Sequence, residues 1–128
     1  MVIDTSAVCA ILLGEPEAEY FAQAVSNDSR RMMSAFSALE SSIVLETRKG
    51  SSGGRELDLF LHNASIDIVP LTSDQYQLAR EAWQKFGKGR HSAGLNIGDC
   101  CSYALSKLSG EPLLFKGNDF IETDVRSC

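Results

Sequence analysis

Four acidic residues stand where the sequence could bring carboxylates together into one site. Asp4 and Asp119 each come after a short apolar run, and the carboxyl ends of parallel strands border the ligand crevice of an open sheet. Glu40 lies within a helical pattern and Asp99 near the start of another. Two carboxylates about 4 Å apart repel by roughly 4 kcal/mol at an effective dielectric near 20, so four converging acids would take up cations. Such a pocket predicts metal-dependent cleavage of a phosphodiester.

Three of these acids also have ordinary structural explanations, which the sequence leaves open. Asp4 could cap a helix that begins near Ser6, and Asp119 could belong to an Asn-Asp turn. Asp99 would complement the dipole of a helix capped by Asn96. That explanation does not account for the neighbouring Gly98, whose missing side chain allows another group to approach closely.

Glu40 is harder to explain as a cap or a surface residue. A capping box Ser37-x-x-Glu40 would leave the preceding apolar residues outside the helix, and Ser34 is an equally good cap. At 100° per residue, Glu40 falls on the same side of its helix as an apolar-rich set of residues, Phe36, Ile43, Val44 and Thr47. We therefore expect Glu40 to face inward, where an unpaired carboxylate is rare without a metal.

Strand and helix patterns alternate along the chain, which predicts an α/β fold with a mostly parallel sheet. Short apolar strands are expected at 2–3, 31–33, 66–69 and 112–115. Helices are expected from Ser6, at 16–25, 35–49, 57–61, 73–86 and 97–109, with 51–54 as a connection and 87–96 as a loop. The length of 128 residues fits a single domain, 1–128.

Composition restricts the class of protein. No apolar run reaches the roughly 20 residues of a membrane span, and the start reads as a strand rather than a signal, so a cytoplasmic protein is expected. The four cysteines lack the paired spacing of a structural zinc site. The net charge of −5 is unusual for a nucleic-acid binder. Local basic clusters answer that objection, and the one that precedes Asp99 is the better candidate for RNA binding: Lys85, Lys88, Arg90 and His91.

Together, these segments resemble the PIN-domain ribonucleases, specifically the VapC-type toxins of bacterial toxin–antitoxin pairs. The resemblance covers nearly the whole chain and is carried by the opening 2–7, the helix start 34–40, the motif 95–105 and the segment 113–120 with Thr123-Asp124. It implies a five-stranded parallel sheet between helices, in a three-layer α/β/α sandwich. The residues that match the family's acidic set are Asp4, Glu40, Asp99 and Asp119, with Asp124 a weaker candidate.

The resemblance also implies cofactors and partners. The acids would bind Mg²⁺ or Mn²⁺, which prefer oxygen ligands, and would cleave single-stranded regions of RNA. A homodimer held inactive by a cognate VapB-type antitoxin is expected, with promoter DNA bound only through the antitoxin. Four polar residues flank the acids and could orient them, although each could also be a cap or turn residue: Thr5, Ser6, Asn96 and Asn118.

Three alternatives to a nuclease make different demands on the sequence. A phosphatase of the haloacid-dehalogenase type would need a second Asp two residues after Asp4, where this chain has Ser6. A receiver-like signalling domain would need an acid after its central strand, but the third expected strand ends in Val69-Pro70-Leu71. A PIN-like module that binds without catalysis stays open, although the intact acids argue against it.

Overall fold

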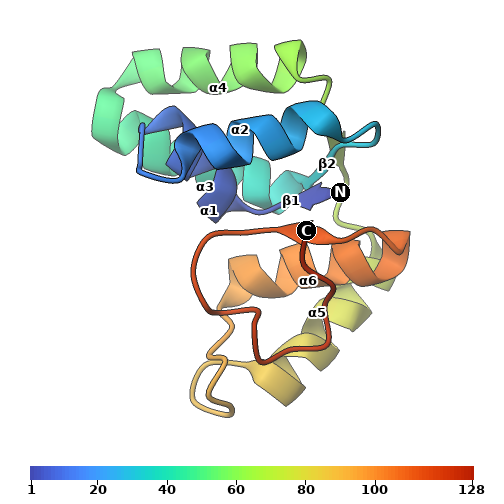
Figure 1. Cartoon of the computed structure of the whole chain (residues 1–128). Coiled ribbons are helices and arrows are strands. Elements are labelled where there is room, and N and C mark those ends of the chain that lie inside the picture. Colours follow the sequence, from blue (N-terminus) through green and yellow to red (C-terminus); the bar gives the residue numbers. More distant parts are fainter.

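The chain folds as an α/β structure in a computed structural model that describes residues 1–128 (Figure 1). Its elements, in chain order, are β1 (Val2–Ile3), α1 (Thr5–Leu12), α2 (Ala18–Asn27), β2 (Met32–Ser34), α3 (Ala35–Lys49), α4 (Ser51–Asn63), β3 (Asp67–Val69), α5 (Ser73–Phe86), α6 (Ile97–Ser109) and β4 (Leu113–Leu114). None of the helices is both long enough and apolar enough to cross a membrane.

The sheet has four strands in the order β3-β2-β1-β4, and all three pairings are parallel. The resemblance implied five strands, so that expectation is wrong by one strand. The C-terminal segment instead adds a single bridge between Leu113 and Ser127, next to β4. The chain moves outward from β1 to β3 and then returns to the other side of β1, so the topology switches between β1 and β4. Ligands of open α/β sheets bind at such a switch, beyond the carboxyl ends of the strands.

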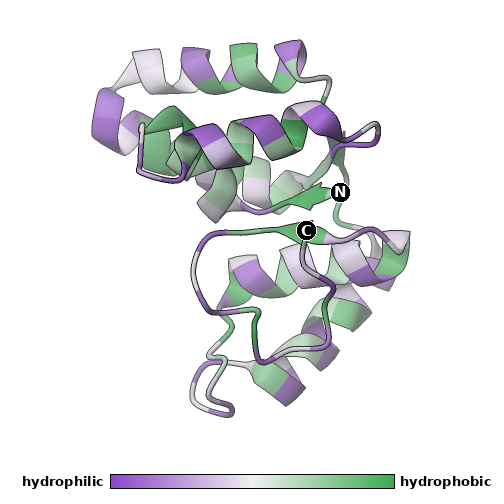
Figure 2. Cartoon of the chain, viewed as in Figure 1, coloured by the Kyte–Doolittle hydropathy of each residue, from purple (hydrophilic) through white to green (hydrophobic).

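Helices cover both faces of this sheet, which confirms the expected three layers. Figure 1 shows α1 to α4 on one side of the strands, with α5, α6 and the C-terminal segment on the other. Successive strand residues alternate between the two cores, because side chains along a strand point to opposite faces. Ile3, Met33 and Leu114 pack under α1 to α4, and their strand neighbours Val2, Met32 and Leu113 pack against α6. Figure 2 shows apolar β1 between helices of mixed polarity.

Helix starts were partly misjudged from the sequence. Helix α1 begins at Thr5 rather than at Ser6, and Asp4 caps it, because the Asp4 side chain accepts a hydrogen bond from the Ser6 backbone NH. Ser34 caps α3, so the alternative Ser37 capping box is wrong. At α6 the sequence was right: Asn96 caps the helix, which ends before Gly110 in the left-handed conformation.

The segment 51–54 is helical, although its serines and glycines predicted a connection. The turn is made by Gly50 alone, at φ 66°, and α4 starts at the next residue. Gly53 is buried against α3, where an added Cβ would lie 2.6 Å from the Leu45 carbonyl carbon and closer still to its oxygen. The glycines are therefore explained by close packing of α3 on α4 rather than by flexibility.

We expect Gly53→Ala to lower the free energy of unfolding by about 1–3 kcal/mol, as overpacking does when backbone must move. Gly54→Ala is the matched control. Its Cβ would meet only the flexible end of the exposed Glu46 side chain, and replacing a helical glycine by alanine should stabilise by roughly 0.5–1 kcal/mol. Urea unfolding of both variants measures the difference, and equal stabilities would contradict the packing argument.

Candidate functional site

Asp4 lies at the carboxyl end of β1 and is held from both sides. Its Oδ2 accepts hydrogen bonds from the backbone NH of Ser6 at 3.0 Å and from the Ser6 hydroxyl at 2.6 Å. Its Oδ1 accepts from the Ser102 hydroxyl at 2.6 Å. The residue is only 4% exposed. Both oxygens of Asp4 are thus fixed in orientation, by the start of α1 and by α6.

Ser102 and Ser37 form a buried pair of hydroxyls behind Asp4. Their oxygens are 3.2 Å apart, and both residues are fully buried. Sequence reasoning missed them, because single serines in helices carry no strong pattern. One signal was available: Ser102 follows Asp99 by three residues, so the two side chains lie on neighbouring turns of one helix face.

Glu40 is half-buried and accepts a hydrogen bond at Oε1 from the Thr5 hydroxyl, at 2.7 Å. An added Cβ at Gly98 would lie 2.7 Å from the same oxygen and 2.9 Å from Oε2. The start of α6 therefore runs directly against the Glu40 carboxylate. This close approach explains why a glycine stands beside Asp99.

The face of α3 that Glu40 shares was predicted wrongly. The buried residues of α3 are Ser37, Ser41 and Leu45, whereas Ile43 is 57% exposed. Hydrophobic periodicity failed here because the buried stripe is small and polar: the Ser41 hydroxyl bonds to the Ser37 carbonyl at 2.8 Å, within the helix. Glu40 reaches the site from the edge of this stripe, three residues after Ser37.

Asp99 is 8% exposed and completes a capping box with Asn96. Its backbone NH donates to Asn96 Oδ1 at 2.9 Å, and its Oδ2 accepts from the Asn96 NH at 3.0 Å. Burial raises the pKa of Asp99 from 3.8 to about 7, against the lowering effect of the Asn96 hydrogen bond. The charges of Asp4, Asp119 and Glu40 raise it further. The three other acids are thus all close enough to act electrostatically on Asp99.

Asp119 and Asn118 are exposed, in the bends that follow β4. The same segment is tied to α1, because the Lys116 backbone NH donates to the Ser6 hydroxyl at 2.9 Å. Asn118 is a turn residue whose carbonyl accepts from the Ile121 NH. The weaker candidate, Asp124, accepts from the Tyr103 hydroxyl at 2.6 Å and from Lys107 at 3.0 Å, so it anchors the segment on α6.

The donor set of the site suits a hard divalent cation, since the four acids offer only oxygen ligands. Burial first, and then the charges of the neighbouring carboxylates, raise the pKa of Asp99, so this group favours the uptake of a proton or a cation. In this structure, however, no three His, Cys, Asp or Glu side chains are arranged to hold a metal ion.

Lys85, Lys88 and Arg90, the predicted RNA-binding residues, are exposed at the end of α5 and in the loop that follows. None of them forms an ion pair with a carboxylate. The Arg90 guanidinium instead lies over the Trp83 ring, 4.3 Å from its centroid. Two aromatic residues of α5 are also partly exposed, Tyr76 at 52% and Trp83 at 43%, because the helix buries Gln75 and Ala82 instead.

In the metal-free protein, we expect the free energy of unfolding to fall as the pH rises from about 3.8 to about 7, the two pKa values of Asp99. In this window the unfolded chain has lost the Asp99 proton and the folded protein still holds it, so raising the pH favours unfolding. Urea unfolding with EDTA between pH 4 and 8 should show a decline that is smaller in Asp99→Asn. Parallel pH profiles of the two proteins would contradict the assignment.

Comparisons with known proteins agree on one family. The PIN domain profile matches residues 1–126. Ribonuclease VapC30 of Mycobacterium tuberculosis is 58% identical over 125 residues, covering 98% of this chain and 95% of the relative. Ribonuclease VapC of Mycolicibacterium smegmatis is 59% identical over 125 residues, covering 98% of this chain and 97% of the relative.

Two solved structures share the fold. The crystal structure of Mycobacterium tuberculosis VapC20, a Sarcin-Ricin loop cleaving toxin, has a TM-score of 0.81 and 16% identity, covering 99% of this chain and 97% of that one. A toxin–antitoxin complex from Klebsiella pneumoniae contains a chain with a TM-score of 0.75 and 15% identity, covering 96% of this chain and 92% of that one. At such low identities these likenesses support the fold alone.

Proposed function

Because the chain belongs to the VapC ribonucleases of the PIN-domain family, we propose that it is a divalent-metal-dependent endoribonuclease toxin inhibited by a cognate antitoxin. The observation that best supports metal dependence is the buried Asp99, on which the charges of Asp4, Glu40 and Asp119 all act. Such an arrangement is unfavourable without a compensating positive charge.

Mg²⁺ or Mn²⁺ would be held by the four carboxylates Asp4, Glu40, Asp99 and Asp119. When bound, the ion supplies a water of lowered pKa and positive charge for the phosphate and the leaving oxygen. The proposed products carry 5′-phosphate and 3′-hydroxyl ends.

The remaining polar residues of the site act on the orientation of the carboxylates. Ser6 and Ser102 hold the two oxygens of Asp4, and Thr5 holds Oε1 of Glu40. Asn96 holds Oδ2 of Asp99. Partners that orient metal ligands in this way contribute about 10–100-fold to metal affinity or activity. These four residues are therefore proposed to fix the geometry in which an ion and RNA are received.

The proposed partners follow from the family. The substrate is single-stranded RNA in the cytoplasm, and the inhibitor is a VapB-type antitoxin. The relatives named VapC, at 58% and 59% identity over nearly the whole chain, support this pairing. A homodimer is also proposed, with DNA reached only through the antitoxin.

Purified protein, freed of any antitoxin, should cut an end-labelled single-stranded RNA when Mg²⁺ or Mn²⁺ is present. EDTA should stop the cleavage, and excess metal should restore it. The fragments should ligate to adaptors that require a 5′-phosphate. Cleavage that persists in EDTA, or fragments that end in a cyclic phosphate, would overturn the metal mechanism. Metal binding without any cleavage would favour the catalytically inactive PIN-like module.

A further inference from the structure

Ser37 is a buried serine whose hydroxyl bonds outside its own helix. It lies in α3, three residues before Glu40, and is fully buried. A buried hydroxyl without a partner is costly, so the partner of Ser37 is informative. That partner is the Ser102 hydroxyl of α6, 3.2 Å away and 65 residues further along the chain. Ser37 therefore connects the helix of Glu40 to the helix of Asp99.

The direction of this hydrogen bond follows from counting protons. A serine hydroxyl carries one proton, whereas a carboxylate oxygen only accepts. Ser102 gives its proton to Oδ1 of Asp4, at 2.6 Å. No proton of Ser102 is then left for Ser37, so the Ser37 hydroxyl is the donor in the pair. The three residues form one directed chain, in which Ser37 donates to Ser102 and Ser102 donates to Asp4.

Donation from Ser37 strengthens the bond that Ser102 makes to Asp4. Hydrogen bonds in such a chain polarise one another, by roughly 10–30% per bond, and they are stronger where water is excluded. All three residues are buried here, with Asp4 only 4% exposed. Ser37 also fixes the place of the Ser102 oxygen. Without the Ser37 hydroxyl, Oδ1 of Asp4 is held less firmly, while Ser6 still holds Oδ2.

The backbone of Ser37 is close to the support of a second acid. Its carbonyl oxygen lies 3.2 Å from the Thr5 hydroxyl, which donates at the shorter distance of 2.7 Å to Oε1 of Glu40. One turn of α3 thus meets the groups that hold both Asp4 and Glu40. Replacing Ser37 by alanine keeps the carbonyl and removes only the hydroxyl, so the change isolates the support of Asp4.

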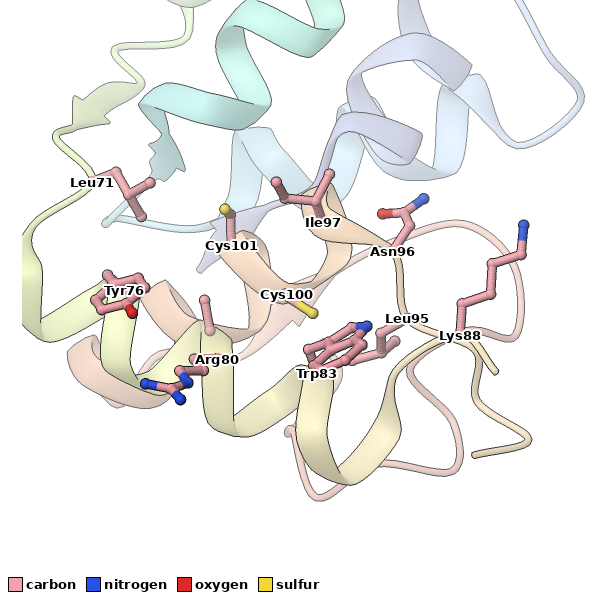
Figure 3. Close-up of a pocket in the computed structure, with 11 residues that line it drawn as sticks. Leu71, Tyr76, Arg80, Trp83, Lys88, Leu95, Asn96, Ile97, Cys100 and Cys101 are labelled. Atoms are coloured by element: carbon pink, nitrogen blue, oxygen red, sulfur yellow. The ribbon is translucent and has the colours of Figure 1, made fainter. Parts of the chain in front are cut away.

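Ser102 faces α3, away from the hollow on the other side of α6. Cys101, the residue before it, lines a hollow of about 460 Å³ between α5 and the start of α6. Figure 3 shows Cys101 among the side chains around this hollow. Neither Ser37 nor Ser102 lines it. Successive residues of a helix point about 100° apart, so a change at Ser37 acts on the inner side of α6 and leaves the hollow intact.

We propose that Ser37 is a positioning residue of the metal site, whose hydroxyl donates to Ser102 and thereby fixes the group that orients Oδ1 of Asp4. This inference rests on the proposed metal-dependent ribonuclease function and adds to it a residue that touches neither the ion nor the RNA. The alternative is a serine that only fills space between α3 and α6.

Metal binding and kinetics of Ser37→Ala test the proposal. In the full-length protein, calorimetric Mn²⁺ titration should show about tenfold weaker binding than in the wild type, the lower end of what partners of metal ligands contribute. At a fixed, subsaturating Mn²⁺ concentration, kcat for single-stranded RNA should fall by a similar factor. KM should stay near the wild-type value, because the fully buried Ser37 does not reach RNA.

Ser41→Ala is the matched control. Ser41 is an equally buried serine one turn further along α3, but its hydroxyl bonds to the Ser37 carbonyl, within the helix. Each variant removes one buried hydroxyl bond, so urea unfolding in EDTA should show similar losses of stability. Only Ser37→Ala should weaken Mn²⁺ binding. Equal Mn²⁺ affinities in the two variants, with metal-dependent cleavage intact, would refute this role of Ser37 and leave the nuclease standing.

A double-variant cycle tests the route through Ser102. Because the Ser37 hydroxyl acts on Asp4 through Ser102, Ser37→Ala should cause no further loss of Mn²⁺ affinity or of cleavage in the Ser102→Ala background. A further tenfold loss in that background would overturn the directed chain. A wild-type protein that neither binds Mn²⁺ nor cleaves RNA would instead refute the proposed function, and this inference with it.

Discussion

Asp4→Asn is expected to lower the rate of RNA cleavage by more than about a hundredfold, the largest loss that a mere supporting partner of a metal ligand causes. The substitution keeps the shape of the side chain and an oxygen that can cap α1, and Asn caps helices as well as Asp does. It removes the negative charge that would bind the ion. The free energy of unfolding in EDTA should therefore change little while activity is lost.

Two further variants are needed to interpret the loss of activity in Asp4→Asn. Asp67→Asn removes an exposed carboxylate at the start of β3 and should cleave RNA at the wild-type rate. Ser102→Ala removes only the hydroxyl that orients Asp4 Oδ1, and we expect a loss of about 10–100-fold. The double variant with Asp4→Asn should be no worse than Asp4→Asn alone, since the hydroxyl acts through that carboxylate.

Single-turnover cleavage and calorimetric Mn²⁺ titration measure both effects. Wild-type cleavage by Asp4→Asn would refute the four-acid mechanism. An equal loss in Asp67→Asn would show that the assay reports general charge rather than this site.

The sequence predicted the structure correctly where a single residue type determines a local feature. The apolar strands and the glycines at 50 and 110 located most elements, and α6 was predicted with its correct bounds. Asp4 and Asp119 were proposed as site residues because the carboxyl ends of parallel strands meet at one edge of a sheet. The fifth strand was implied by the family resemblance rather than by the sequence pattern. In this chain only one bridge, between Leu113 and Ser127, stands in its place.

The sequence failed where the contact is between residues distant along the chain. Ser37 and Ser102, which are 65 residues apart, look like unremarkable helical serines until α3 and α6 are packed together. The same packing buries the small, polar side of α3, so an apolar pattern pointed to the wrong face for Glu40. Local propensity and hydrophobicity do not encode which two helices pack together. The hydroxyl groups that orient the acids are brought into place by that packing.

Gly98→Ala should separate activity from stability. Alanine is the better helix former by roughly 0.5–1 kcal/mol, so the folded state should be at least as stable as in the wild type. Its Cβ, however, would lie 2.7 Å from Oε1 of Glu40, and the carboxylate must move away. A displacement near 1 Å at a reacting centre can lower activity by about a hundredfold, so we expect a loss of tenfold or more.

Gly54→Ala is the matched control, because its Cβ would meet Oε1 of Glu46 at 2.6 Å in the same way, and Glu46 is an exposed carboxylate outside the proposed site. It should show the helix stabilisation without the loss of cleavage. Shortening the acid in Gly98→Ala/Glu40→Asp withdraws the carboxylate by one methylene and should recover part of the activity. If Gly98→Ala cleaves RNA as fast as Gly54→Ala does, the position of the Glu40 carboxylate has no bearing on the reaction, and Glu40 must be removed from the proposed metal ligands.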